Sequence, residues 1–291
     1  MSTRGVGLRS EGPRTPPRML QVASIVDLGP SLRRVWLAGD LQSFPSAAEA
    51  SHIKLFFRRP GQAELCLPRL GPSGVVWPPP AARPIARTYS VAAFDASAQR
   101  VAVDFVLHGE QGPATRWATH ARLGDTLGLA GPGGPNPMLG PASRYLLVGD
   151  LTALPAISAL VAAMPHDRRA TVLIEVPALH ERYTLPANPR VRVSWCVRAY
   201  GQRSPLPAQV CALALAPEDT FAFVAGENTA VVAIRNHLLG ERGFGSHQLY
   251  ATPYWREQQS EEEYHEQRHR IMDELTKPHN GAPRAVTGQH R

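Results

Sequence analysis

The chain has 291 residues, of which 43% are hydrophobic and 19% are charged, and its formal net charge is +7. This length exceeds one ordinary domain of ~100–200 residues and the composition is that of a globular protein, so we expect two folded domains. The arginines that carry the charge are scattered without interleaved aromatic residues, so the usual pattern of a nucleic-acid-binding protein is excluded.

The N-terminal segment and the cysteines bear on location. Residues 1–18 contain four arginines but no apolar run, so they lack the core of a secretory signal and are predicted to form a disordered arm. No segment approaches the ~18 apolar residues of a membrane span. The three cysteines, Cys66, Cys196 and Cys211, fit neither a disulfide framework nor a zinc or iron–sulfur site. The sequence predicts a cytoplasmic protein with no membrane insertion and no metal centre.

Short strand patterns fill the first domain, which we expect at 19–140. Apolar or alternating runs between turn residues predict strands at 19–27, 32–38, 52–57, 87–94, 100–108 and 125–130. Several strands at such close spacing are typical of a small antiparallel β-barrel. The segment 70–84 is too rich in proline for a central strand, and it is expected to be a loop over the barrel.

After Gly134 the pattern changes to strands and helices that take turns. Strands are predicted at 144–150, 169–177, 191–197, 219–227 and 247–255, and helices at 152–164, 206–215 and 228–242. Apolar strands separated by helices predict a doubly wound parallel sheet, expected here at 141–256. Residues 257–291 are expected to form a charged helix and a mobile tail. The HEQRH stretch at 265–269 matches a zinc pattern, but its charged flanks indicate a solvated helix.

The stretch RTYS at 87–90 is unusually polar for a strand. Alternation places Arg87 and Tyr89 on one face of this strand and Ser90 on the other. A guanidinium, an aromatic ring and a hydroxyl group together suit an anionic, planar, redox-active ligand. An exposed edge strand with one polar and one aromatic face would explain the same residues.

A second motif, HGEQGPATRW at 108–117, follows the next strand. Its glycines permit tight turns, and the residues up to Thr115 resemble a helix start whose free N–H groups could hold a pyrophosphate. The alternative is an ordinary turn in which Thr115 caps a short helix. Because the two motifs lie on neighbouring strands, each strengthens the ligand-binding interpretation of the other.

The order of these motifs resembles the siderophore-interacting protein family, a branch of the ferredoxin-reductase-like flavoproteins. The resemblance rests on R-x-Y-S, then HGxxGPATxW, then an α/β half that opens with LLVGDLTALPA at 146–156. It extends to HIKLFF (52–57), VDFVLHG (103–109), FVAGENTAV (223–231) and YWR (254–256), and it covers about residues 19–265. It implies an antiparallel flavin-binding β-barrel followed by a ferredoxin-NADP reductase-like α/β domain.

The resemblance also implies how FAD is held. Arg87 would contact a phosphate or ribityl group, Tyr89 would lie against the isoalloxazine, and Ser90 would reach the N5 region of the ring. The other implied cofactor-binding residues are Thr88, Asp104, Val106, His108, Gly112, Ala114, Thr115, Asp150 and Thr152. Asp150 and Thr152 lie at a strand end where nucleotides bind in open α/β sheets, but they could equally cap the following helix.

Cationic residues are expected near the flavin because ferric catecholates are bulky anions. Lys54 and Arg256 match family positions suited to positioning this substrate, although either could be a solvated charge at a strand end. Arg198 and Arg203 could select the 2′-phosphate of NADPH. The turn at 224–230 could line the nicotinamide side of the site or simply start a helix.

The sequence therefore predicts an FAD-dependent enzyme that reduces cytoplasmic ferric siderophores with electrons from NADPH or NADH and releases Fe(II). It predicts a monomer or a weak homodimer. Two alternatives remain open. One is a flavin oxidoreductase coupled to ferredoxin or another protein, and the other is a protein that binds siderophore or flavin without turnover.

Overall fold

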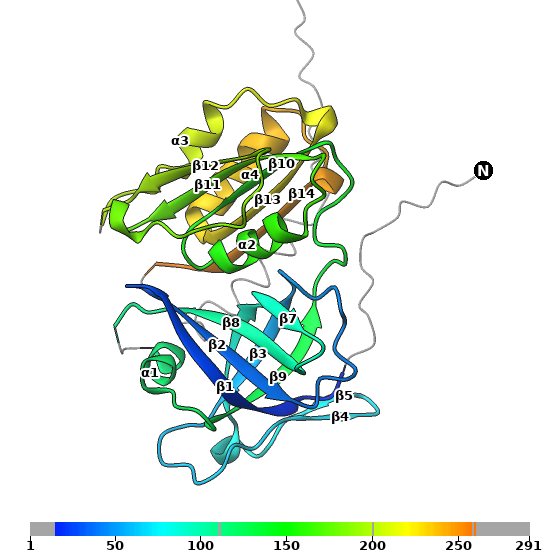
Figure 1. The fold of residues 1–291 in the computed structure, drawn as a ribbon, viewed down its shortest axis with the longest axis vertical. Coiled ribbons are helices and arrows are strands. Elements are labelled where there is room, and N and C mark those ends of the chain that lie inside the picture. The colour runs from blue at the N-terminus through cyan, green and yellow to red at the C-terminus, as the bar shows by residue number, and fades with distance from the viewer. Residues whose placement is uncertain (1–14, 110–111, 200, 258, 260–291) are drawn as a thin grey trace, which may run out of the picture.

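The computed structural model describes residues 15–109, 112–199, 201–257 and 259. The predictions for the arm before residue 15 and for the helix and tail from residue 260, including 265–269, lie outside these residues. Two sheets organise the chain, an antiparallel one from the first half and a parallel one from the second half (Figure 1). None of the described helices is long and apolar enough to cross a membrane.

The first half forms a seven-stranded sheet in the order β6-β3-β9-β1-β2-β8-β7, and all its pairs are antiparallel. The strands are β1 (Arg18–Gly29), β2 (Leu32–Gly39), β3 (His52–Phe57), β6 (Ile85–Ser90), β7 (Ala93–Asp95), β8 (Arg100–Val106) and β9 (Thr126–Gly133). The rings of Tyr89 on β6 and Phe105 on β8 are only 4.7 Å apart, so the sheet curls until its two ends meet. This confirms the predicted antiparallel barrel.

Two local predictions in this half need correction. The segment 70–84 is not only a loop, because β4 (Arg69–Gly71) and β5 (Gly74–Val76) pair there as a separate hairpin, followed by the 3-10 helix η1 (Pro80–Ala82). The predicted strand 87–94 breaks into β6 and β7 because the chain changes partners. Val91 donates its N–H to Ser51 beside β3, and Ala92 donates to Ala102 on β8.

The second half is a five-stranded parallel sheet in the order β12-β11-β10-β13-β14. The strands are β10 (Arg144–Gly149), β11 (Arg169–Val176), β12 (Val191–Val197), β13 (Thr220–Glu227) and β14 (Leu249–Trp255). The helices are α2 (Leu154–Ala163), α3 (Leu206–Cys211) and α4 (Asn228–Gly240), and three further 3-10 helices are η2 (Leu179–Glu181), η3 (Pro217–Asp219) and η4 (Ser246–Gln248). The doubly wound parallel sheet is confirmed, although α3 ends earlier than the predicted 206–215.

The helices divide the hydrophobic core of this half into two clusters. Leu154, Ile157 and Leu160 of α2 lie in one cluster, and Val231, Ile234 and Leu238 of α4 lie in the other, on the opposite face of the sheet. Alternation along the apolar strands supplies both clusters, since successive side chains point to opposite faces. This is why the strands read as continuous apolar runs.

The two halves pack against each other through the face of the sheet that α2 covers (Figure 1). Leu32 of β2, Ala50 and Met138 belong to the same buried cluster as α2. At the carboxyl end of the parallel sheet, the hydroxyl groups of Ser90 and Tyr254 are 3.4 Å apart. The RTYS motif of the first half is therefore close to the carboxyl edge of the second.

Candidate functional site

The RTYS residues of β6 distribute over both faces of the strand as alternation predicts. Register pairs Lys54 with Thr88 and His52 with Ser90, so these side chains share one face. Lys54 Nζ donates a hydrogen bond of 2.6 Å to Thr88 Oγ1. The structure thus brings the predicted substrate-positioning lysine together with two of the predicted cofactor residues.

Arg87 and Tyr89 lie on the other face of β6, opposite Leu55 and Ile53 of β3. Both side chains are half-buried, and the Arg87 guanidinium donates to the carbonyl oxygen of Ala86 at 2.8 Å. The Tyr89 ring packs at 48° against Phe105, which in turn lies 5.6 Å from Trp117 of α1. These rings connect the RTYS strand to the second motif.

That second motif forms the start of helix α1 (Pro113–His120). Ala114 and Thr115 are buried, whereas His108 is exposed, and its Nε2 lies 3.4 Å from the Thr115 hydroxyl. Gly112 is the N-cap and, among the described residues, no side chain caps the helix, so Thr115 does not take the capping role that was the alternative. The structure therefore brings together His108, Gly112, Ala114 and Thr115.

Two predicted cofactor residues on β8 have other neighbours. The buried carboxylate of Asp104 accepts both of its hydrogen bonds from Arg34 across the β2–β8 pair, at 2.7 and 2.8 Å. Val106 is half-buried and packs against the core cluster of the second half. The sequence analysis missed Arg34, although opposite charges on adjacent strands are a signal once the register is known.

Asp150 is the centre of a hydrogen-bond network at the carboxyl ends of β10, β13 and β14. Its Oδ1 accepts from the backbone N–H and the hydroxyl of Thr152, at 2.8 and 2.5 Å. Its Oδ2 accepts from the Glu227 N–H and from the Trp255 indole, both at 2.8 Å. All four bonds lie within the chain, so the carboxylate fixes the relative positions of three strand ends.

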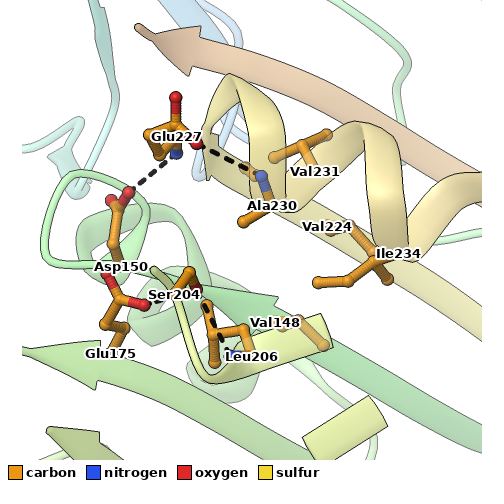
Figure 2. A pocket seen from close by; sticks show the side chains of 11 residues that line it. Val148, Asp150, Glu175, Ser204, Leu206, Val224, Glu227, Ala230, Val231 and Ile234 are labelled. Carbon is orange, nitrogen blue, oxygen red and sulfur yellow. Dashed lines mark hydrogen bonds between the residues drawn. The ribbon is translucent and has the colours of Figure 1, made fainter. Parts of the chain in front are cut away.

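Asp150 also lines a small pocket with Glu175 and Glu227 (Figure 2). Glu227 caps α4, since its Oε2 accepts from the N–H groups of Thr229 and Ala230, at 2.6 and 3.2 Å. The turn at 224–230 thus starts helix α4, which was one of the two interpretations of this segment. The opposite wall of the pocket is apolar and is formed by Val148, Leu206, Val224, Ala225, Val231 and Ile234.

Glu175 is buried near the end of β11 and has two partners. The Ser204 hydroxyl donates to its Oε2 at 2.5 Å, and the Arg198 guanidinium lies 3.5 Å from its Oε1. Burial raises the pKa of Glu175, while Ser204 and Arg198 oppose that rise. Arg198 also donates to Glu257 at 2.7 Å, so this candidate for phosphate selection is already paired with two carboxylates.

The other predicted cation, Arg256, is half-buried and directly follows Trp255 at the end of β14. Tyr254, two residues earlier, faces Ser90 of the first half, and burial raises the pKa of its phenol. The contacts of Tyr254 and Trp255 were not predicted, because their partners are 164 and 105 residues away in the sequence. Within the described ranges, no group of three or more potential ligands could hold a metal ion.

The residues of β6 and of the start of α1 fit FAD in their chemistry. The uncapped start of α1 offers N–H groups without intrahelical partners, as a pyrophosphate requires. Gly109 has φ +83°, and a Cβ added there would meet none of the described atoms within 4 Å, so the backbone is open to a ligand. Arg87 and Tyr89 add a guanidinium for phosphate and an aromatic ring for a planar group.

Known proteins share this architecture. Residues 21–136 match the model of the siderophore-interacting FAD-binding domain, and residues 142–258 match the model of the siderophore-interacting protein. Ferric vibriobactin reductase ViuB of Vibrio cholerae is 38% identical over 271 residues, which cover 92% of this chain and 99% of that protein.

Solved structures agree. The siderophore-interacting protein SipS from Aeromonas hydrophila is 39% identical with a TM-score of 0.79, over 89% of this chain and 98% of that one. A ferredoxin NADP+ reductase from Neisseria gonorrhoeae shares the fold, with 16% identity and a TM-score of 0.54 over 82% of this chain and 99% of that one. The chain therefore belongs to the siderophore-interacting protein family.

Proposed function

We propose that this protein is an FAD-dependent reductase of ferric siderophores that takes its electrons from NADPH or NADH in the cytoplasm. One observation carries the proposal. The rings of Tyr89, Phe105 and Trp117 link the RTYS strand to α1, and this link supports a single site that combines the Arg87 guanidinium, the Tyr89 ring and a helix start suited to phosphate. The similarity to a ferric vibriobactin reductase over nearly the whole chain supports it.

In this proposal the first half holds FAD. Arg87 and the start of α1 bind the phosphates, and Thr88, Tyr89 and Ser90 lie along the isoalloxazine. His108, Gly112, Ala114 and Thr115 surround the pyrophosphate arm, with Asp104 and Val106 on the adjacent strand. FAD held by these residues would supply the redox chemistry, namely hydride acceptance from a nicotinamide and one-electron transfer to ferric iron.

The second half would receive the electron donor at its carboxyl edge. The strand order reverses beside β10, and ligands of open α/β sheets bind where this reversal occurs. Asp150 and Thr152 hold the turn after β10 in position, and Asp150 also orients the Glu227 N–H and the Trp255 indole. These contacts keep the edge in one conformation.

The substrate would be a ferric siderophore attracted by Lys54 and Arg256. Thr88 accepts a hydrogen bond from Lys54, and this contact holds the ammonium group beside the β6 face. Hard oxygen ligands bind Fe(II) less tightly than Fe(III), so reduction releases the iron without any acid, base or nucleophile from the chain. The role of the protein is to bind and orient both partners.

The proposal is tested with the purified protein under anaerobic conditions. The visible spectrum should show flavin bands that bleach with NADPH or NADH and return when a ferric catecholate or a ferric hydroxamate is added. A protein that binds no flavin would refute the proposal. Flavin that bleaches with neither a nicotinamide nor reduced ferredoxin would instead identify a binding protein without turnover.

Charge variants test the substrate positions. Lys54→Ala and Arg256→Ala should slow reduction of an anionic ferric catecholate by about tenfold and that of a neutral complex much less, because only the anion loses an ionic contact. Lys54→Arg, which keeps the charge, and Arg69→Ala, an exposed residue on the β4–β5 hairpin, are the matched controls. Equal slowing of both substrates would contradict the assignment.

A second candidate is a reductase that takes electrons from ferredoxin, and one observation weakens the case for NADPH as the donor. Arg198, the residue considered for binding the 2′-phosphate of NADPH, is paired with Glu175 and Glu257. Its positive charge is therefore largely neutralised. Stopped-flow reduction of the flavin by reduced ferredoxin, compared with NADPH and NADH at equal concentrations, distinguishes the two donors. Faster reduction by ferredoxin would establish the second candidate.

A further inference from the structure

Four arginines line a cavity at the amino edge of the parallel sheet. Arg144 opens β10, Arg169 opens β11, and Arg190 and Arg192 lie at the start of β12. The cavity has a volume of about 500 Å³ and also includes the Ala214–Leu215–Ala216 segment after α3. It is lined by none of the residues assigned above to FAD, donor or substrate.

The strand register places these arginines on one face. Arg144 is the partner of Arg169, and Thr171 is the partner of Arg192. Neighbours in a parallel pair point the same way, and side chains alternate along each strand. Leu146 and Leu173, two and four residues farther along β10 and β11, lie in the buried cluster beneath α3 and α4. The arginines therefore lie on the face of the sheet that α3 and α4 cover, just outside the apolar core and at the amino ends of the strands.

Within the part of the chain that the structure describes, no carboxylate lies within ion-pair distance of these four arginines. All four side chains are exposed, and their guanidinium groups make neither a hydrogen bond nor an ion pair with any described residue. Asp167, two residues before Arg169, instead lies 3.5 Å from Arg168. Like charges gathered on neighbouring strands repel each other, so the cluster is a feature that an anionic ligand would stabilise.

The cavity combines this charge with apolar surface. Leu146, Ala170, Pro189 and Leu215 contribute the apolar part of its lining. Arginine binds phosphate with two parallel hydrogen bonds, and cavities of about 300–1,000 Å³ are usual for small-molecule sites. We propose that this cavity binds a small polyphosphorylated molecule of the nucleoside di- or triphosphate class, with its phosphates on the arginines and its base on the apolar wall.

This site is distinct from the proposed donor position. β10 begins at Arg144 and ends at Gly149, next to Asp150, so a strand length of about 17 Å separates the two edges. A nucleotide in the cavity would therefore leave the carboxyl edge accessible. Nucleotide binding in this cavity does not require reductase activity, so it can be tested independently of flavin binding and reduction.

Isothermal titration calorimetry tests the proposal on the full chain at constant ionic strength. ATP, ADP and AMP are titrated separately, and the arginine variants described next distinguish binding in this cavity from binding at the donor edge. ATP is expected to bind at least about tenfold more tightly than AMP, because it brings two more phosphates to the arginines. No heat from ATP at about 1 mM, or equal affinity for ATP and AMP, would overturn the proposal.

A pair of double variants locates the binding. Arg144→Gln with Arg192→Gln should weaken ATP binding at least about tenfold, whereas Arg69→Gln with Arg122→Gln removes the same charge from exposed positions elsewhere and should change it less than about twofold. Equal losses in both variants would show a general charge effect and refute the site. If the first double variant does not fold, the single variant Arg192→Gln replaces it, because Arg192 lies on the edge strand β12. Unchanged ATP affinity in this single variant would also refute the site.

Discussion

At the scale of single residues, Asp150 shows how a predicted ligand can be a structural residue. The spacing of GDLTALPA suggested either a nucleotide contact or a helix cap. The carboxylate accepts four hydrogen bonds, and two of the donors, Glu227 and Trp255, are remote in sequence. No local pattern could have indicated these two, because they depend on which strands become neighbours.

Asp150→Ala should lower the free energy of unfolding by about 3–5 kcal/mol, because several buried donors lose their acceptor at once. Trp255→Phe removes only one of these hydrogen bonds and should cost about 1–2 kcal/mol. Urea denaturation followed by circular dichroism measures both. Equal effects of the two substitutions would show that the network does not act through the Asp150 carboxylate.

The raised pKa of Glu175 predicts a pH-dependent contribution to stability. Between its ordinary pKa of 4.5 and the raised value, the folded protein keeps a proton that the unfolded chain has released. The folded state is therefore favoured below this window and loses that advantage as the pH rises through it. Glu175→Gln cannot ionise. Its stability relative to the unmodified protein should increase as the pH rises from 4.5, which urea titrations at several pH values can measure.

A relative stability that stays constant across this pH range would contradict the prediction. Ser204→Ala provides a control. It removes the hydroxyl that opposes the effect of burial, so it should widen the same window toward higher pH.

At the scale of elements, the turn between β13 and α4 depends on Gly226. Its φ is +132°, and a Cβ added there would lie 2.5 Å from Asp150 Oδ2. Gly226→Ala should therefore strain the backbone and displace the Asp150 carboxylate, with a loss of about 3 kcal/mol or more. Gly74→Ala is the matched control, because its φ of +126° is similar but no described atom lies within 4 Å of the added Cβ, and it should cost only the backbone strain of about 1–3 kcal/mol.

Thermal and urea unfolding of the two glycine variants separate strain from collision. If Gly74→Ala were as destabilising as Gly226→Ala, backbone conformation alone would explain both results. The contact with Asp150 would then have no measurable effect.

Most elements could be predicted because periodicity in the sequence reports which faces are buried. The parallel strands were clear from their continuous apolar runs, and the alternation in RTYS correctly separated Arg87 and Tyr89 from Ser90. The failures have physical reasons. The break after Ser90 arises because the N–H groups of Val91 and Ala92 donate to different partners, Ser51 and Ala102. The β4–β5 hairpin forms outside the main sheet, so the prolines around it interrupt none of the hydrogen bonds of that sheet.

At the scale of the whole molecule, one buried cluster joins the two halves. It includes Leu32 of β2 as well as Leu154 and Ile157 of α2. A division of the chain by composition could predict two sheets, but not that a residue from the first would complete the core of the second. The candidate site depends on the same packing, because Ser90 meets Tyr254 only when the halves are in contact.

This shared core predicts coupling between the halves that amide hydrogen exchange can detect. Leu32→Ala should cost about 2–5 kcal/mol, as other buried leucine truncations do, and part of that loss should reach α2 through the common cluster. Leu20→Ala removes an equally buried side chain from the core of the first half alone. Amide hydrogen exchange of peptides that contain α2 should therefore accelerate at least about tenfold in Leu32→Ala and remain unchanged in Leu20→Ala. The reason is that only Leu32 shares a buried cluster with that helix. Equal acceleration in both variants would mean that the two halves unfold as one unit, and no acceleration in either would mean that the cluster transmits nothing between them.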